Sequence, residues 1–168
     1  MIVDFQAHIF PESYVGAVRR IDGNVIFEPP DPYSGMTYVY DRRLGQRINT
    51  ATFEGRNPDK RVQHMDELGI DVQVLSIPPP GADRFEEHDA ITIACAANDA
   101  LAAFCRTHPN RFVGLATLPS ASTTASIEEL NRAIIDLGLR GFGCFSNLNG
   151  RPLDSEELLP LWEHIAEL

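Results

Sequence analysis

Two polar side chains near the N-terminus are the first residues whose type and spacing suggest chemistry. Gln6 and His8 alternate at the end of an apolar, β-rich run from Ile2 to Pro11. Residues two apart in a strand point to the same face, so both side chains can reach one point beyond the end of the strand. Imidazole nitrogens and amide oxygens can both bind a metal ion. The pair is therefore a candidate beginning of a metal site.

Three more polar residues are candidates for substrate binding because they end or follow predicted strands. Ser76 closes an apolar run at 72–76, whereas Asn147 and Asn149 follow a run at 141–145. Turn chemistry is the alternative for all three, because hydroxyls are common at strand ends and Asn149-Gly150 is a typical turn pair.

The remaining candidates have simpler explanations. The other histidines are expected at the surface or at helix ends, and the three cysteines show no C-x-x-C spacing, which indicates reduced thiols. A cluster of arginines at 42–47 could receive a substrate carboxylate, with a solvated basic patch as the alternative. These residues are His64, His88, His108 and His164, then Cys95, Cys105 and Cys144, then Arg42, Arg43 and Arg47.

Alternating strand and helix patterns must position these side chains. Asn57 and Pro58 predict the start of a helix that Gly69 ends, and strands are predicted at 72–76, 111–117 and 141–145. Helices over 86–107 and 123–137 separate these strands, and Asp154 with Glu157 predicts a capping box for a last helix. Together with the first strand, this order predicts four β/α units around a parallel sheet.

Residues 12–56 interrupt this alternation with a polar stretch rich in proline and glycine. We expect a long inserted loop with a short helix and a hairpin from the runs at 25–27 and 36–40. On a β/α fold the insert would lie over the same end as Gln6 and His8, which makes it a candidate lid. The alternative is an excursion without a role in chemistry.

Composition narrows the functional class. The 168 residues suit a single domain, and 14 basic against 24 acidic side chains give a formal charge of −10. Apart from the three arginines at 42–47, no basic cluster stands out against this negative charge, so nucleic acid and anionic membrane surfaces are not expected partners. The chain shows no apolar run of about 20 residues and no secretory signal, so a cytoplasmic protein is expected.

Four segments, in order, resemble one family. Residues 3–11 (VDFQAHIFP) are similar to the D-x-H-x-H-x-x-P opening of the amidohydrolase superfamily. Residues 65–76, 109–119 and 147–154 resemble the branch of aminocarboxymuconate-semialdehyde decarboxylase and the resorcylate decarboxylases. The set covers nearly the whole chain except the insert at 12–56.

The resemblance implies a TIM-like (β/α)₈ barrel that holds a divalent metal, usually zinc, at the carboxyl ends of its strands. His8 occupies the second ligand position, and Gln6 occupies the first, where the family has His or Glu. A neutral amide suits zinc poorly, so Gln6 is expected to be a weak ligand or to orient water. The expected activity is nonoxidative decarboxylation of a small carboxylated substrate, and hydrolysis of a C–C or ester-type bond is the alternative.

Length separates this chain from the family. A barrel of this kind needs about 250 residues, and the remaining family ligands follow the fourth strand. Residues 1–168 therefore resemble an apparently truncated N-terminal half, which we expect to be inactive alone. A catalytically dead half-barrel with a structural or interaction role is the other interpretation. Open sheet edges predict one of three states: a fragment of a longer enzyme, association with another half or with itself as a homo-oligomer, or a marginal remnant.

Overall fold

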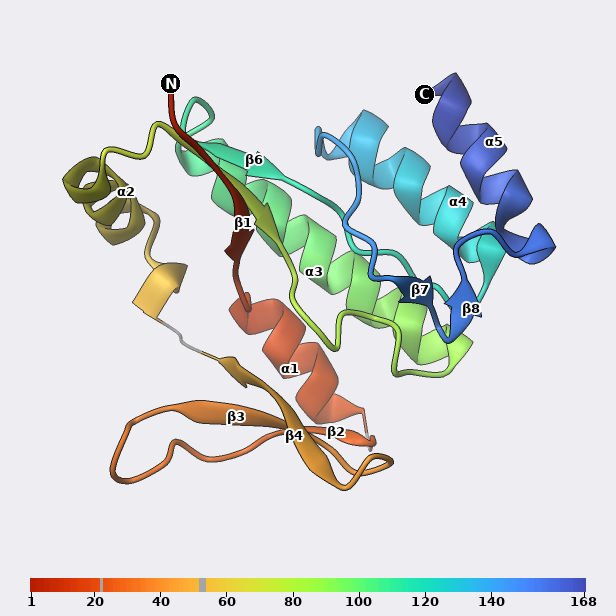
Figure 1. Ribbon diagram of the computed structural model, residues 1–168, viewed down its shortest axis with the longest axis horizontal. Coiled ribbons are helices and arrows are strands. Elements are labelled where there is room, and N and C mark those ends of the chain that lie inside the picture. Colours follow the sequence, from red (N-terminus) through yellow and green to blue (C-terminus); the bar gives the residue numbers. More distant parts are fainter. Residues whose placement is uncertain (22, 52–53) are drawn as a thin grey trace.

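The computed structural model describes residues 1–21, 23–51 and 54–168. At its centre lies a parallel sheet with the strand order β1-β5-β6, formed by β1 (Val3–His8), β5 (Val72–Ser76) and β6 (Phe112–Gly114) (Figure 1). Beyond β6, Ala116 makes a parallel bridge to Phe142. The carboxyl ends of the strands therefore meet at one edge, as the predicted β/α order requires.

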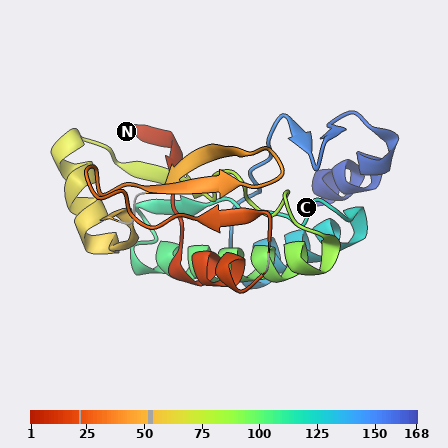
Figure 2. The same cartoon turned by 90° about the horizontal axis from the view of Figure 1, so that it is seen from below.

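Three helices cover one face of this sheet. In Figure 2, α1 (Glu12–Arg20), α3 (Glu87–Thr107) and α4 (Thr123–Asn131) lie in one layer on the same side of the strands. The buried alanines of α3, together with Ile93 and Leu101, pack into the core beneath the sheet. The other elements are α2 (Pro58–Leu68), α5 (Leu159–Glu167), the short helices η1 (Glu54–Arg56), η2 (Arg132–Asp136) and η3 (Glu156–Leu158), and the hairpin of β7 (Asn147–Leu148) and β8 (Arg151–Pro152).

The termini of α2 confirm the sequence prediction. The Asn57 side chain accepts a hydrogen bond from the backbone N–H of Lys60 at 3.0 Å, so it caps one of the unpaired amides of the first turn. Gly69 ends the helix in the left-handed region at φ 70°. Met65 packs into the core, whereas Leu68 is 58% exposed because α2 lies at the edge of the domain.

The fourth strand and the last helix depart from prediction. The segment at 141–145 forms no regular strand; Gly143 donates to the Ala116 oxygen at 2.9 Å and Ala116 donates to the Gly141 oxygen at 2.8 Å. Two glycines within three residues disfavour regular strand structure, which accounts for the difference. Ser155, rather than Asp154, precedes the terminal helical turn, so the predicted capping box is wrong.

The insert contains more regular structure than the predicted loop with a hairpin. After α1, the strands β2 (Val25–Phe27), β3 (Thr37–Asp41) and β4 (Gln46–Ala51) form a three-stranded antiparallel sheet. Its apolar side joins the core, where Phe27 packs edge-on against Phe10 at a centroid distance of 5.4 Å. The insert is therefore a packed subdomain of α1 and this sheet.

None of the helices in the described ranges is long and apolar enough to cross a membrane.

Candidate active site

A cavity of about 280 Å³ opens at the carboxyl ends of β1 and β5. Gln6 and His8 line it from β1, and Ser76 lines it from β5. Cys144 and Phe145, from the segment that follows the Ala116–Phe142 bridge, close the opposite wall. The structure therefore brings together both predicted metal ligands and one of the three predicted substrate-binding residues.

A bulge in β1 shapes this end of the strand. The register runs from Asp4 opposite Gln73 to Ala7 opposite Leu75, so β1 has one residue more than β5 over this span. The Gln6 N–H instead faces an Asp4 carboxylate oxygen at 3.3 Å. Bulges often re-aim side chains beside active sites, and here Ala7 is buried while Gln6 and His8 remain exposed.

A polar network beneath the cavity holds the bulged strand. The other Asp4 oxygen accepts from the Gln73 amide at 2.8 Å, and the Gln73 oxygen accepts from Arg61 Nε at 2.6 Å. Arg61 also donates to the backbone oxygen of His8 at 3.2 Å. Burial lowers the pKa of Arg61 from its usual range, and the nearby Asp4 carboxylate partly opposes this shift. The network fixes the backbone on both sides of Gln6.

The His8 ring contacts the side chain of Ser76. Their strand positions are paired in the parallel register, and His8 Nδ1 lies 3.0 Å from Ser76 Oγ. Ser76 therefore contacts a candidate metal ligand in addition to lining the cavity.

A second cavity, of about 630 Å³, adjoins the first, because Pro79 and Phe145 line both. Its walls come from the β3–β4 connection of the insert, from the loop after β5 and from the β7–β8 hairpin. Its charged and amide side chains include Arg43, Gln46, Arg47, Asp83, Arg84, Asn147 and Asn149.

Two predicted arginines, Arg43 and Arg47, lie in this second cavity. Arg47 is held by an ion pair with Glu28 at 2.9 Å and by the Tyr38 ring, whose centroid is 3.9 Å from the guanidinium carbon. Arg43 pairs with Glu86 at 3.2 Å. The third predicted arginine, Arg42, lines a different pocket beside α1 and β2.

Asn147 and Asn149 line the second cavity and also build the β7–β8 turn. Asn149 and Gly150 have φ values of 51° and 79°, the left-handed conformation that a type I′ turn requires. The Asn147 side-chain oxygen accepts from the Gly150 N–H at 2.9 Å. Turn chemistry thus accounts for much of their sequence signal, and substrate binding by these residues stays a prediction.

Several residues of the two cavities were missed by sequence reasoning. Cys144 lines the same cavity as His8. The other two cysteines lie outside both cavities, and burial raises the pKa values of the Cys95 and Cys105 thiols to about 11. Asp83 and Arg84 belong to a loop without a recognisable motif, and burial raises the pKa of Asp83, which accepts a short hydrogen bond from Ser120. A position near the end of the strand predicted at 141–145 was the signal available for Cys144.

The donors in the first cavity fit a metal ion in part. His8 offers an imidazole and Gln6 an amide oxygen, and both face the cavity at the strand end. Within residues 1–21, 23–51 and 54–168, no three His, Cys, Asp or Glu side chains are grouped so that they could hold a metal ion. A complete coordination shell therefore needs donors in addition to His8 and Gln6.

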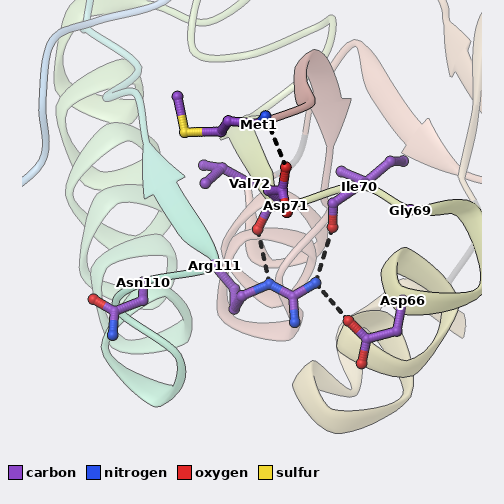
Figure 3. A pocket seen from close by; sticks show the side chains of 8 residues that line it. All are labelled: Met1, Asp66, Gly69, Ile70, Asp71, Val72, Asn110 and Arg111. Atoms are coloured by element: carbon purple, nitrogen blue, oxygen red, sulfur yellow. Dashed lines mark hydrogen bonds and ion pairs between the residues drawn. The ribbon is translucent and has the colours of Figure 1, made fainter.

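A third pocket, of about 710 Å³, lies at the opposite, amino-terminal ends of the strands (Figure 3). Arg111 donates to the backbone oxygens of Asp71 and Ile70 at 2.8 and 2.9 Å and pairs with Asp66 at 2.7 Å. The Met1 amino group lies 3.6 Å from the Asp71 carboxylate. The charged groups of this third pocket are paired with one another, as expected at the amino-terminal end of a β/α barrel, where residues contribute to stability.

The other histidines lie away from both cavities. His64 pairs with Glu67, His108 lies near Asp59 and against the Phe112 ring, and His164 contacts Asn131. His88 is exposed in the first turn of α3. The four positions agree with the predicted surface and helix-end roles.

Comparison with known proteins identifies the family of this chain. The chain matches the amidohydrolase family over residues 3–168. It is 39% identical over 168 residues to 2-amino-3-carboxymuconate-6-semialdehyde decarboxylase of Dictyostelium discoideum, a match that covers 99% of this chain and 46% of that protein. The chain thus spans about half the length of this relative.

Solved structures show the same partial coverage. The 2,6-dihydroxybenzoate decarboxylase from Rhizobium superposes with a TM-score of 0.68 at 26% identity, covering 99% of this chain and 46% of that chain. Dihydroxybenzoic acid decarboxylase from Polaromonas sp. JS666, with bound manganese and the inhibitor 2-nitroresorcinol, gives 0.67 at 25% identity with the same coverage. The chain belongs to the amidohydrolase family, and its β/α units form part of that family's barrel.

Proposed function

We propose that this chain carries the N-terminal part of the active site of a metal-dependent, nonoxidative decarboxylase acting on a small carboxylated substrate. The observation that carries the proposal is the shared wall of Pro79 and Phe145, which sets a cavity with Gln6 and His8 beside one with arginines. Relatives that decarboxylate amino- and hydroxyl-bearing carboxylates support it.

In this proposal His8 and Gln6 hold a divalent metal at the end of β1. The resemblance favours zinc, and the Polaromonas relative binds manganese, which accepts oxygen donors such as the Gln6 amide more readily. When bound, the metal would act as a Lewis acid toward a substrate oxygen. His8 and Gln6 contribute by fixing its place in the first cavity, next to the cavity with the arginines.

Arg43 and Arg47 would bind and orient the carboxylate of the substrate. A guanidinium binds a carboxylate through two parallel hydrogen bonds, which fixes direction as well as distance. The contacts of Arg47 with Glu28 and Tyr38 pre-order its side chain, so less conformational entropy is lost on binding. Breaking the C–C bond releases carbon dioxide and leaves the electron pair of that bond on the substrate carbon. An acid must then protonate this carbon.

The remaining metal ligands and that acid would come from polypeptide outside the described residues. The relatives are about twice as long as this chain, and the described residues lack a three-donor group. We therefore propose that residues 1–168 alone bind metal weakly and do not turn substrate over.

A second candidate function is a half-barrel without catalysis that serves as an interaction protein. It is favoured by Gln6, a poor zinc ligand, and by the exposed apolar side chain of Phe5 on the edge strand β1, which is 73% exposed.

A chimera decides between these functions. Residues 1–168 would replace the matching part of the Dictyostelium decarboxylase, and carbon dioxide release from that enzyme's substrate would be measured with added Mn²⁺ or Zn²⁺. We expect metal-dependent release that His8→Ala abolishes. A chimera that folds cooperatively and binds metal but releases no carbon dioxide would contradict catalysis by these residues and favour the interaction protein.

A further inference from the structure

Ser76 and His8 form a pair across two parallel strands. His8 is the last residue of β1 and Ser76 the last residue of β5, and their positions are paired in the register. The next residue, Ile9, donates its N–H to the backbone oxygen of Ser76 at 3.1 Å, so the two backbones stay joined at this point. The side chains meet through Nδ1 and Oγ at 3.0 Å.

This contact occupies one ring nitrogen and leaves the other for the cavity. A neutral imidazole has one protonated nitrogen and one nitrogen with a free lone pair. A metal bound at Nε2 needs the lone pair there, so the proton must reside on Nδ1. Ser76 Oγ can accept that Nδ1–H, as carboxylates, carbonyls and waters do for ligating histidines elsewhere.

The position of Ser76 makes it a rigid partner. It lies on the central strand β5, between β1 and β6, and its side chain is half-buried. The backbone hydrogen bond from Ile9 to Ser76 holds the two strand ends together beneath the side chains. A hydroxyl on this fixed backbone, 3.0 Å from Nδ1, restricts both the tilt of the ring and the choice of protonated nitrogen.

We propose that Ser76 is a positioning residue that holds His8 with its proton on Nδ1 and its Nε2 lone pair facing the cavity. This role rests on the proposed metal site at His8, and it replaces direct substrate binding as the function of Ser76. The hydroxyl acts only through the imidazole.

The first test reads the tautomer directly, without metal. Long-range ¹H–¹⁵N spectra of the 168-residue chain, at a pH where the imidazoles are neutral, report which His8 nitrogen is protonated, and His8→Ala identifies the signals. We expect the Nδ1–H form to dominate in the wild type and in Ser76→Thr, which keeps the hydroxyl. Ser76→Ala should shift His8 toward the Nε2–H form that free imidazoles favour. Thr117→Val is the matched control, because it removes a hydroxyl near the end of the neighbouring strand away from His8.

The second test measures affinity for the metals alone. Calorimetric titration with Zn²⁺ and with Mn²⁺ should show a loss of roughly 10- to 100-fold for Ser76→Ala, with wild-type affinity in Ser76→Thr and Thr117→Val. Equal metal affinity and equal tautomer populations in the wild type and Ser76→Ala would overturn the role of Ser76 alone. A wild-type chain that binds neither metal would contradict the proposed function, and with it the ligand role given to Nε2.

Discussion

The side-chain amide of Asn49 donates a hydrogen bond to the backbone oxygen of Pro79 at 2.8 Å. This bond joins the last strand of the insert to the loop that follows β5, and Pro79 lines both cavities of the candidate site. On the other side of the same loop, the buried Tyr14 hydroxyl of α1 donates to the Gly81 oxygen at 2.9 Å. The insert is thus anchored to the loop at two points and supplies a fixed wall of the second cavity.

Removing the charge at Arg47 should weaken carboxylate binding. Arg47→Met keeps much of the side-chain length but loses the guanidinium, and a charge-assisted hydrogen bond contributes about 1.5–3 kcal/mol. Titration of 2,6-dihydroxybenzoate, followed by NMR shifts of the residues around the second cavity, measures the loss. Arg42→Met is the control, because Arg42 lies in another pocket. Equal weakening by both variants would indicate non-specific attraction to positive charge.

Replacing the buried Asn98 should destabilise the fold without changing the cavities. Its amide donates to the Thr117 oxygen at 2.9 Å and to Glu129 at 2.6 Å, and its oxygen accepts from the Thr117 N–H at 2.9 Å. Asn98→Ala leaves these buried groups unpaired, at a cost of about 2–3 kcal/mol in the free energy of unfolding. Urea denaturation measures it, with the exposed Gln63→Ala expected to change stability by less than about 0.5 kcal/mol. Similar unfolding midpoints for the two variants would contradict this role for Asn98.

Acid should remove a stabilising contribution of Asp71. The Ile2 N–H, bonded at 2.5 Å, is the main cause that lowers the pKa of Asp71, and the charged N-terminus and Arg111 lower it further. Because the pKa is lower in the folded state, the contribution is present above the unfolded value, about 3.9, and is lost as the pH falls through the folded value. Asp71→Asn should therefore be less stable than wild type at neutral pH and equally stable in strong acid. A stability gap that stays constant across an acid series of urea titrations would contradict the assignment.

The edge strand β1 should drive self-association. Phe5 is 73% exposed on this strand, and a charge at such a position disfavours edge-to-edge pairing. Sedimentation velocity over a concentration series should show dimers or larger species for the wild type and monomer for Phe5→Glu. Tyr33→Glu, at a 98% exposed position on the β2–β3 connection, should behave as wild type. A wild-type chain that is monomeric at every concentration would contradict this prediction.

Local signals predicted the elements that depend on local chemistry. Asn57 and Gly69 specify the ends of α2 by capping and by left-handed backbone, which neighbouring residues alone determine. The strand β4, Gln46 to Ala51, was not predicted because its sequence is mostly polar. Antiparallel pairing with β3, rather than its own sequence pattern, stabilises it as a strand. The regular strand predicted at Gly141–Phe145 is wrong. Glycines weaken strand structure, and this segment makes only isolated hydrogen bonds to Ala116.

The candidate site was predicted where alternation along one strand was enough. Gln6 and His8 line one cavity as their spacing required, although the sequence does not reveal the bulge between Asp4 and Ala7 that contains Gln6. Cys144, Asp83 and Arg84 reach the cavities only through the packing of loops that are distant in sequence. Asn147 and Asn149 lie in a separate cavity from Ser76, because the hairpin turns them toward the insert.

The central claim, that the end of β1 is a metal site weakened at Gln6, is tested most directly by Mn²⁺ broadening of NMR signals. In the ¹⁵N-labelled wild-type chain, substoichiometric Mn²⁺ should broaden first the amides around Gln6, His8 and Ser76. Gln6→His should raise the affinity by at least about tenfold, or 1.4 kcal/mol, because it replaces an amide with an imidazole. His8→Ala should abolish the local broadening. Broadening that begins at surface carboxylates, and that neither substitution changes, would contradict the account.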